Sequence, residues 1–339
     1  MTATGLPFDD VRALVARMPA PDEVSAAKAA AREARLLKPA GALGRLEEIA
    51  AWLATWQGRH PPRVDRPVAA VFAGNHGIAA KGVSAYPPSV TAEMMEAFRN
   101  GKAAINQLCA ANDVGLKLFD LALDYPTADF TQEAALDEKA CAGTIAFGME
   151  AIAGGADLLC IGEMGIGNTT SAAALGAALF GGTGADWAGP GTGLDAAGVA
   201  RKAAVIDEAL KLHGNALADP LEALRRVGGR ELAAMAGAVI AARFEKIPVI
   251  VDGFTATAAV AVLWKINPES LDHCLFAHRS AEPAHDRMLK AMGKEPLFDF
   301  SLRLGEASGA VLAVPIVRAA AALHSGMGTF DEAGVSGKA

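Results

Sequence analysis

The sequence predicts an α/β fold: a doubly wound, mostly parallel sheet with a small helical domain built from both chain ends. Short apolar runs appear from residue 67 onward, and most lead through a polar or glycine-rich turn into an alanine-rich helical pattern. This alternation is typical of parallel strands joined by crossover helices. Helical patterning near both chain ends predicts the small domain. The apolar runs are 67–74, 114–124, 156–163, 247–253 and 273–278.

The N-terminal segment, residues 6–57, is predicted to be helical. Asp22 precedes the run EVSAAKAAAREARLL, and Leu43 to Trp56 carries apolar residues at helical spacing. The segment HPPRVDRP (60–67) breaks this pattern and is typical of a linker. Residues 306–324 return to helical character. We therefore expect a small helical domain formed by 1–64 and 303–339, and a large Rossmann-like domain, 65–302, that carries the substrate sites.

The composition is that of a compact, enzyme-sized protein. Of the 339 residues 52% are hydrophobic and 20% are charged, and a net charge of −7 offers no basic footprint for nucleic acid. The four cysteines lie scattered in apolar contexts without zinc-like spacing, which favours free thiols in a reducing compartment. The N-terminus lacks a signal-peptide pattern, and the stretch 309–323, broken by Pro315 and Arg318, is too short to span a bilayer. We expect a cytoplasmic protein without nucleic-acid or membrane partners.

Two glutamates are candidates for acid–base chemistry. In GEASG (305–309), Glu306 follows Gly305 and precedes a long apolar stretch, so its carboxylate is expected to be partly desolvated, with a raised pKa. The alternative is a glutamate that caps its own helix. Glu163 stands at the end of a predicted strand, and two carboxylates that converge on one cleft would raise the pKa of one of them. The histidines have no metal spacing such as HExxH, so no metal is expected.

Two glycine-rich loops are candidate anion sites. GIGNTT (165–170) follows a strand and opens a helix, whose N-terminus presents free N–H groups. GPGTGLD (189–195) precedes a helix that carries Lys202, and together the loops would suit one phosphate. A glycine-rich turn with a threonine cap, and a surface loop before a solvated lysine, are the plain alternatives. The residues implicated are Gly165, Gly167, Asn168, Thr169, Gly191, Thr192, Gly193 and Lys202.

The segment GVSAYPPSVTAEM (82–94) offers a candidate site for a planar heterocycle. Its Ser84, Tyr86 and Glu93 supply a hydroxyl, an aromatic ring and a carboxylate in a loop that leads into a helix. A proline-ordered turn with a packed tyrosine is an equal alternative. Asp252 and Ser280 are added from their positions at the ends of two predicted strands.

Eight segments, taken together, resemble one family, the nicotinate-nucleotide–dimethylbenzimidazole phosphoribosyltransferases of cobalamin lower-ligand assembly. They occur in the family's order and span nearly the whole chain. The segments are KPAGALGRLEEIA (38–50), FAGNHGIAAKGVSAYPPSVTAEM (72–94), GEMGIGNTTSAAAL (162–175), GPGTGLD (189–195), VDGFTATAA (251–259), AHRSAEPAH (277–285), LRLGEASGA (302–310) and GMGTFDEAGVS (326–336).

The resemblance implies an enzyme that moves the phosphoribosyl group of nicotinate mononucleotide to 5,6-dimethylbenzimidazole, with inversion, giving α-ribazole 5′-phosphate and nicotinate. It implies that Glu306, at the position of the glutamate in the family's LGEGSG motif, is the general base and that Glu163 is a second active-site carboxylate. The glycine-rich loops and Lys202 would hold the 5′-phosphate, and the 82–94 segment would lie near the base pocket. No cofactor is implied, and the expected assembly is a homodimer.

The chain departs from the family pattern at five positions. Asn75 stands where aspartate is more usual, Glu93 where glutamine is common, and Lys102 where glycine is usual. Ala42 and Ala284 replace the usual serine and glycine. Glu93 has the largest expected consequence, because an extra carboxylate near the heterocycle would shift the preference for the base. The base specificity is therefore left open.

Two other functions, and one variation on the first, remain as alternatives. A non-catalytic sensor or carrier of nicotinate mononucleotide or a benzimidazole would keep the pockets but would have no need for Glu306. A dinucleotide-dependent oxidoreductase would require GxGxxG after the first strand, where the chain reads NHG (75–77). The same transfer to a different base is the third possibility.

Overall fold

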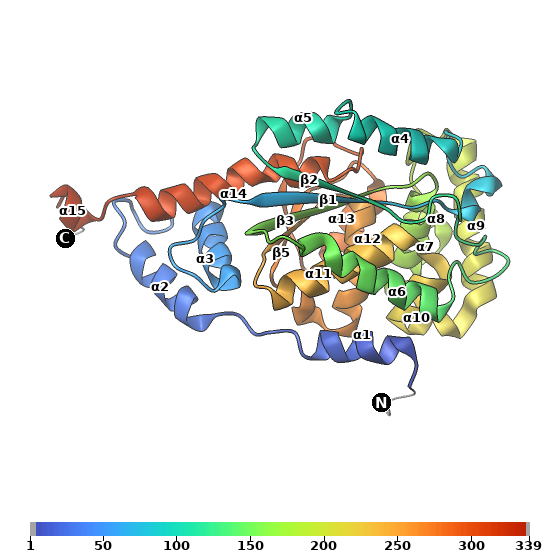
Figure 1. Ribbon diagram of the computed structural model, residues 1–339, viewed down its shortest axis with the longest axis horizontal. Helices are drawn as coiled ribbons and strands as arrows, with labels where there is room; N and C mark the ends of the chain where they lie inside the picture. Colours follow the sequence, from blue (N-terminus) through green and yellow to red (C-terminus); the bar gives the residue numbers. More distant parts are fainter. Residues whose placement is uncertain (1–4, 337–339) are drawn as a thin grey trace.

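The computed structural model describes residues 5–336, and within this range its strands form one six-stranded sheet. All strands run parallel, in the order β2-β1-β3-β4-β5-β6. Helices cover both faces of this sheet (Figure 1). The predicted α/β, doubly wound fold is therefore confirmed. The strands are β1 (Pro67–Ala73), β2 (Gly115–Asp120), β3 (Leu158–Met164), β4 (Val249–Val251), β5 (Cys274–His278) and β6 (Pro296–Phe298).

The described helices alternate with these strands along most of the chain. The α-helices are α1 (Pro7–Ala16), α2 (Glu23–Glu33), α3 (Arg45–Gln57), α4 (Ser89–Arg99), α5 (Ala104–Ala111), α6 (Glu138–Gly148), α7 (Asn168–Phe180), α8 (Gly184–Trp187), α9 (Ala196–His213), α10 (Pro220–Val227), α11 (Arg230–Phe244), α12 (Phe254–Ile266), α13 (Pro283–Ala291), α14 (Ser308–Gly326) and α15 (Phe330–Ala333). The 3₁₀ turns are η1 (Gly77–Lys81), η2 (Met149–Ile152), η3 (Gly214–Ala218) and η4 (Pro268–Leu271).

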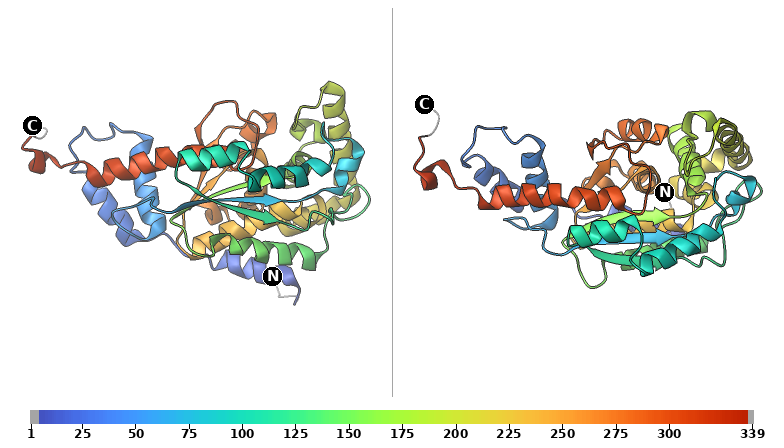
Figure 2. Two further views of the ribbon diagram at one scale, coloured as in Figure 1. Left: turned by 45° about the horizontal axis from the view of Figure 1, so that its top comes forward. Right: turned by 90° about the horizontal axis from the view of Figure 1, so that it is seen from above.

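The sheet separates two hydrophobic cores. Because successive side chains of a strand point to opposite faces, Ala70 and Phe72 of β1 join one core, and Ala69 and Val71 join the other. The first core lies under α6, α7, α11 and α12, and the second lies under α3, α5 and α14. The two further views show α5 and α14 on one side of the sheet and α6 and α11 on the other (Figure 2).

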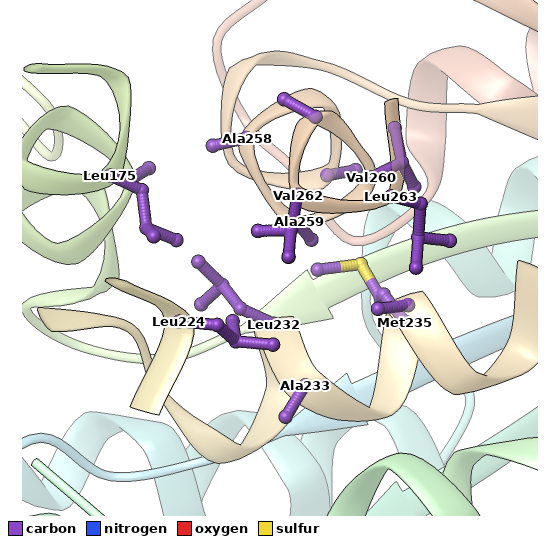
Figure 3. Close-up of a cluster of buried hydrophobic side chains, with 14 of the residues drawn as sticks. Leu175, Leu224, Leu232, Ala233, Met235, Ala258, Ala259, Val260, Val262 and Leu263 are labelled. Carbon is purple, nitrogen blue, oxygen red and sulfur yellow. The ribbon is translucent and has the colours of Figure 1, made fainter. Parts of the chain in front are cut away.

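Helices α7, α11 and α12 are buried on almost all sides, which explains why most of their residues are small and apolar. Leu175 of α7, Met235 of α11 and Val262 of α12 meet in one cluster (Figure 3). All three of these side chains are fully buried. Since α7 begins directly after the glycine-rich loop at 165–167, its packing in the core fixes the position of that loop.

Helices α2 and α3 pack beside the C-terminal half of α14, away from the sheet (Figure 1). Arg32 of α2 donates hydrogen bonds to the carbonyl oxygens of His324, Ser325 and Met327 at 2.7–2.9 Å. These carbonyls at the end of α14 have no partner within a helix, so Arg32 satisfies them. The two ends of the chain therefore share one helical unit.

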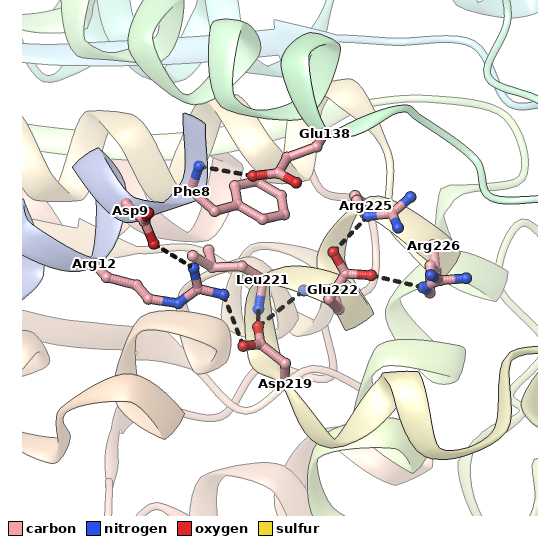
Figure 4. Close-up of polar contacts among 9 residues, drawn as sticks. All are labelled: Phe8, Asp9, Arg12, Glu138, Asp219, Leu221, Glu222, Arg225 and Arg226. Atoms are coloured by element: carbon pink, nitrogen blue, oxygen red, sulfur yellow. Dashed lines mark hydrogen bonds and ion pairs between the residues drawn. The ribbon is translucent and has the colours of Figure 1, made fainter. Parts of the chain in front are cut away.

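Helix α1 packs on the α/β part of the protein, against α6 and α12. The carboxylate of Glu138 accepts a hydrogen bond from the Phe8 N–H at 3.0 Å, and Arg12 pairs with Asp219 at 2.8 Å (Figure 4). Phe8 itself is buried in the first core. The division into 1–64 plus 303–339 and 65–302 remains a prediction, and the contacts of α1 are with the larger unit.

One strand of the sheet was not expected from the sequence. Strand β6 was not predicted, because a three-residue strand at the sheet edge carries too short an apolar pattern. The helical character predicted for 306–324 is confirmed, and α14 continues through Pro315 and Arg318, which interrupt only its apolar run. By length and composition α14 resembles a membrane span, yet half of its apolar window is buried inside the protein, as in the core helix of a globular domain.

The strand order places a ligand-binding crevice next to β1. The chain passes from β1 to β2 on one side and then returns to β3 on the other side, so the direction of the crossovers reverses between β1 and β3. In doubly wound sheets ligands bind outside the carboxyl ends of the strands at this point. The segments that begin at Gly74 and at Gly165 leave the sheet there.

Candidate active site

A cavity of about 270 Å³ opens at the carboxyl ends of the strands, where the topology places a ligand site. Nine of the residues singled out from the sequence line it. These are Tyr86, Glu163, Gly165, Asn168, Thr169, Gly191, Thr192, Ser280 and Gly305. The cavity thus joins loops that are more than 200 residues apart in the chain.

The other candidate residues do not line the cavity themselves. Lys202, Asp252 and Glu306 are buried, and Ser84 contacts the lining residue Thr192. Gly167 and Gly193 adopt positive φ angles of 98° and 120°, which shape the two glycine-rich loops. Glu93 lies on an exposed face of α4 and does not line the cavity.

One half of the cavity carries groups that favour an anion. The N-terminus of α7 and the side chain of Thr169 face it. The Lys202 Nζ donates to Thr169 Oγ1 and to the carbonyl oxygen of Gly189, both at 3.0 Å. Burial lowers the pKa of Lys202 to about 8, although the charge of Glu282 opposes this shift. An anion bound here would supply the counter-charge that the buried ammonium group requires.

The loop around Gly191 is held from three sides. Its N–H donates to Glu282 Oε1 at 2.8 Å, and its carbonyl oxygen accepts from Arg303 at 2.7 Å. Thr192 Oγ1 contacts Ser84 Oγ at 3.0 Å, which ties this loop to the segment that carries Tyr86. Glu282 and Arg303 both line the cavity and were not predicted from the sequence. Both lie in segments that resemble the family, 277–285 and 302–310, but the sequence did not show that their side chains reach this loop.

Glu163 sits at the end of β3 with its carboxylate almost fully buried. Burial, followed by the negative charge of Glu231, raises its pKa to about 8, although a hydrogen bond from the Asn168 amide acts against the shift. A carboxyl group with this pKa is mostly protonated at neutral pH. It can therefore donate a hydrogen bond as well as accept one.

Glu306 occupies the turn directly before α14. It and Ala307 both have positive φ angles, 63° and 61°, which non-glycine residues adopt rarely and mainly at constrained or functional positions. Burial raises the pKa of Glu306 to about 7, and the charge of Asp252 adds to this, while the Ile105 N–H opposes it. Its Oε2 has no hydrogen-bond partner among residues 5–336. The carboxylate is thus poised to take up a proton near neutral pH.

A second buried network, under the loop at 163–168, was missed in the sequence. His76 contacts Glu231 at 2.5 Å through Nε2 and Ser171 Oγ at 3.1 Å through Nδ1. A side chain at Gly165 would place its Cβ 3.0 Å from Glu231 Oε1, so glycine lets the loop lie directly on this carboxylate. His76 was noted only as a histidine at a strand end, and Glu231 gave no sequence signal.

Among the described residues, no group of three or more His, Cys, Asp or Glu side chains is arranged to hold a metal ion. The four cysteines are free and buried. Burial raises the pKa of the Cys109 thiol to about 11 and that of Cys274 to about 12, so neither is a reactive thiolate at neutral pH. The ionisable side chains that line the cavity, besides Tyr86, are Glu163, Glu282, Arg303 and His278.

Comparison with known proteins identifies relatives over the whole length of the chain. The sequence profile of the family described as Phosphoribosyltransferase (DBI_PRT) matches residues 18–335. The nicotinate-nucleotide–dimethylbenzimidazole phosphoribosyltransferase of Brucella canis is 63% identical over 336 residues, which cover 99% of each chain. The enzyme of the same name from Brucella anthropi is 62% identical over 337 residues, again covering 99% of each chain.

Solved structures agree with the fold. A crystal structure of the enzyme of that name from Thermus thermophilus superposes with a TM-score of 0.86 at 41% identity, covering 94% of this chain and 100% of the other. A second, described as CobT from the same organism, gives a TM-score of 0.87 at 42% identity and covers 93% and 99%. The family resemblance expected from the eight sequence segments is confirmed.

Proposed function

Because the chain belongs to the phosphoribosyltransferase family matched above, we propose that it transfers the 5-phosphoribosyl group of nicotinate mononucleotide to 5,6-dimethylbenzimidazole. The products are α-ribazole 5′-phosphate and nicotinate, in the assembly of the cobalamin nucleotide loop. The observation that carries this proposal is the cavity, which has Glu163 in its lining, and Glu306 buried next to the lining residue Gly305, both carboxyl groups having a raised pKa.

The 5′-phosphate is assigned to the anion-binding half. The N-terminus of α7, the Thr169 hydroxyl and the ammonium group of Lys202 converge there. The N–H groups of the glycine-rich loop can approach phosphate oxygens closely because no side chains intervene. Arg303 adds a second cation on the same side of the cavity. This arrangement would fix one end of the donor substrate and leave its anomeric carbon facing the carboxylates.

Glu306 is assigned as the general base. It would take the N–H proton of the benzimidazole while the other ring nitrogen forms a bond to the anomeric carbon. The bond from that carbon to the nicotinate nitrogen breaks on the opposite face, and its electron pair leaves with nicotinate. One inversion results, so no covalent intermediate with the protein is needed. The wall of the cavity next to Glu306 is formed by Gly305.

Glu163 is assigned as the second active-site carboxyl group. Since its pKa is raised to about 8, it is mostly neutral when Glu306 is half ionised. A neutral carboxyl group does not repel the carboxylate of nicotinate, and it can donate a hydrogen bond to the donor substrate. Holding both ring systems on opposite faces of one ribose would supply much of the rate, up to about 7–11 kcal/mol in ideal cases.

The binding site for the acceptor base is assigned to the rim that carries Tyr86. The Tyr86 ring lines the cavity and is 54% exposed in the absence of a substrate, so it is free to pack on a planar heterocycle. Ser84, Ser280 and Asp252 were assigned to substrate contact from the sequence, and Ser280 lines the cavity. Glu93 faces solvent on α4, so any effect on base preference would act at the outer edge of this site.

Three further features belong to this proposal. The enzyme would act as a homodimer in the cytoplasm. The helical unit built from both chain ends would form a small domain beside the large α/β domain. Neither a cofactor nor a metal ion enters the reaction as written.

The test is product formation by the purified protein. Nicotinate mononucleotide and dimethylbenzimidazole are mixed with the protein, and the products are identified by mass and by the NMR coupling at the anomeric carbon. The proposal expects nicotinate and the α-anomer of ribazole phosphate in equal amounts. Binding of both substrates without turnover would instead favour a carrier or sensor, and turnover only with adenine or a phenol would reassign the acceptor.

A further inference from the structure

We propose that Asp252 and His278 form a carboxylate–histidine pair that positions Glu306 and keeps its carboxylate able to accept a proton. Asp252 lies directly after β4, and His278 is the last residue of the adjacent strand β5. Asp252 was expected from the sequence to contact substrate, and His278 had no assigned role. The inference rests on the proposed function of Glu306 as the general base.

The Asp252 side chain holds the first turn of α14. Its Oδ1 accepts a hydrogen bond from the Ala310 N–H at 3.0 Å, one of the helix-terminal groups that lack a partner within the helix. Asp252 is only 1% exposed and does not line the cavity. Since Glu306 immediately precedes α14, a bond that fixes the start of this helix also fixes the turn that carries Glu306. Asp252 is therefore a positioning residue.

His278 approaches the same Asp252 oxygen. Its Nε2 is 3.6 Å from Asp252 Oδ1, and the Phe298 ring stacks on it with the two centroids 6.0 Å apart. A side chain at Gly309 would place its Cβ 2.2 Å from His278 Cδ2 and 2.8 Å from Asp252 Oδ1. The absence of a side chain at this position thus allows α14 to pack directly on the pair.

The charges around these groups come from several elements. Asp252 and Glu163 face Glu306 from the ends of β4 and β3, and the Ile105 N–H faces it from the first turn of α5. Asp299 and His285 lie around His278 in addition to Asp252. Burial lowers the pKa of His278, but the nearby carboxylate of Asp252 outweighs it, and the net shift is upward. His278 in its charged form therefore offsets part of the negative charge that Asp252 directs at Glu306.

Substitutions of Asp252 and His278 are predicted to shift the pKa of Glu306 in opposite directions. Asp252→Asn keeps an oxygen that can accept from the Ala310 N–H but removes the charge, so the pKa of Glu306 should fall. His278→Gln removes the cation that offsets Asp252, so the pKa of Glu306 should rise. A merely structural pair would lower activity in both variants without moving the pH dependence in opposite directions.

The experiment compares pH profiles of kcat/KM for the full-length wild type, Asp252→Asn and His278→Gln. The expected result is that the acid limb moves down by about one pH unit in Asp252→Asn and moves up in His278→Gln. Glu231→Gln is the matched control, because Glu231 acts on Glu163 and should leave this limb in place. The proposal would be overturned if the acid limb had the same midpoint in all four proteins. It would also be overturned if the midpoint moved in the same direction in Asp252→Asn and His278→Gln.

A second readout does not depend on turnover. The protein is labelled with glutamate enriched in ¹³C at the side-chain carboxyl, and its signals are followed by NMR as the pH changes. The resonance absent from Glu306→Gln identifies Glu306, and its midpoint should shift downward in Asp252→Asn and upward in His278→Gln. If the wild type turns over no substrate, the proposed function fails, while these titrations still decide the role of the pair.

Discussion

The N–H of Glu306 donates a hydrogen bond to the carbonyl oxygen of Glu163 at 3.0 Å. One backbone bond therefore joins the end of β3 to the turn before α14, and the two carboxyl groups assigned to the reaction share a single support. The turn is further held by the Ser308 hydroxyl, which donates to the Gly305 carbonyl oxygen at 2.6 Å. These backbone contacts hold Glu306 in a sparsely populated backbone conformation, so its side-chain carboxylate does not have to take part in fixing the turn.

A substitution at Gly162 should disturb this support. A Cβ at Gly162 would lie 2.0 Å from the backbone nitrogen of Ala307 and 2.5 Å from its Cα. Because these are backbone atoms, the turn that carries Glu306 has to move. We expect Gly162→Ala to lower the free energy of unfolding by about 1–3 kcal/mol, with a larger fractional loss in kcat than in substrate affinity. Chemical denaturation and steady-state kinetics measure the two effects.

Gly143→Ala is the matched control for that change. Gly143 lies in α6 on an exposed face, and a Cβ there would meet nothing within 4 Å. The same substitution should therefore stabilise the protein by about 0.5–1 kcal/mol and leave kcat unchanged. Normal activity and stability of Gly162→Ala would show that the turn tolerates displacement, against this account.

The rate should increase with pH through the neutral range. Glu306 must be ionised to take a proton, and its pKa is raised to about 7, so kcat/KM should fall as the pH drops below that value. If the pKa of this glutamate were unperturbed, the fall in kcat/KM would occur near pH ~4.3 instead. The measurement is a pH series with saturating dimethylbenzimidazole and limiting nicotinate mononucleotide.

Ionisation of the acceptor base has to be separated from that of the protein. Repeating the series with a second benzimidazole of different ring pKa makes this distinction. A limb that stays near the pKa of Glu306 with both bases belongs to the protein, as we expect. A limb that follows the ring pKa of the base would argue against Glu306 as the titrating group.

Lys202 should contribute to affinity for the donor. A hydrogen bond to a charged group is worth about 1.5–3 kcal/mol, so Lys202→Met should raise the dissociation constant of nicotinate mononucleotide roughly 10- to 100-fold. Since burial lowers the pKa of Lys202 to about 8, affinity in the wild type should also weaken above that pH, where the ammonium group loses its proton. Calorimetric titration with nicotinate mononucleotide measures both effects.

Arg201→Met provides the comparison for this variant. Arg201 precedes Lys202 on α9, but its side chain is exposed and donates to the Gly82 carbonyl oxygen at 3.1 Å. The substitution removes the same charge from the protein as a whole without touching the cavity. If both variants weaken binding equally, the effect comes from net charge and the assignment of Lys202 is wrong.

The fold was predictable because its strands carry a strong local signal. The first five strands were found from runs of buried apolar residues, and the helices after them from alanine-rich patterns. Strand β6 escaped because three residues give no period, and its place is set by pairing with β5. The continuity of α14 through Pro315 also depends on packing, since its buried face rests on the sheet and α3.

Much of the site was predictable because its residues lie in loops at strand ends. The glycine-rich segments and Glu163 could be found by position, because the carboxyl ends of parallel strands share one edge. Glu231 could not, since it reaches the site from a helix without a motif, and Arg303, although it lies in the segment 302–310, was not singled out because attention fell on Glu306. Glu93 shows the opposite limit, because membership in the 82–94 segment did not reveal that its side chain points into solvent.

The most direct test of the account is the activity of Glu306→Gln. Glutamine keeps the size of the side chain but cannot take a proton, and a positioned base is typically worth about 10²–10⁴-fold in rate. We predict a fall in kcat of this size, with the dissociation constant of nicotinate mononucleotide changed less than about threefold and the melting temperature preserved. Formation of α-ribazole 5′-phosphate by Glu306→Gln at the wild-type rate would contradict the central claim.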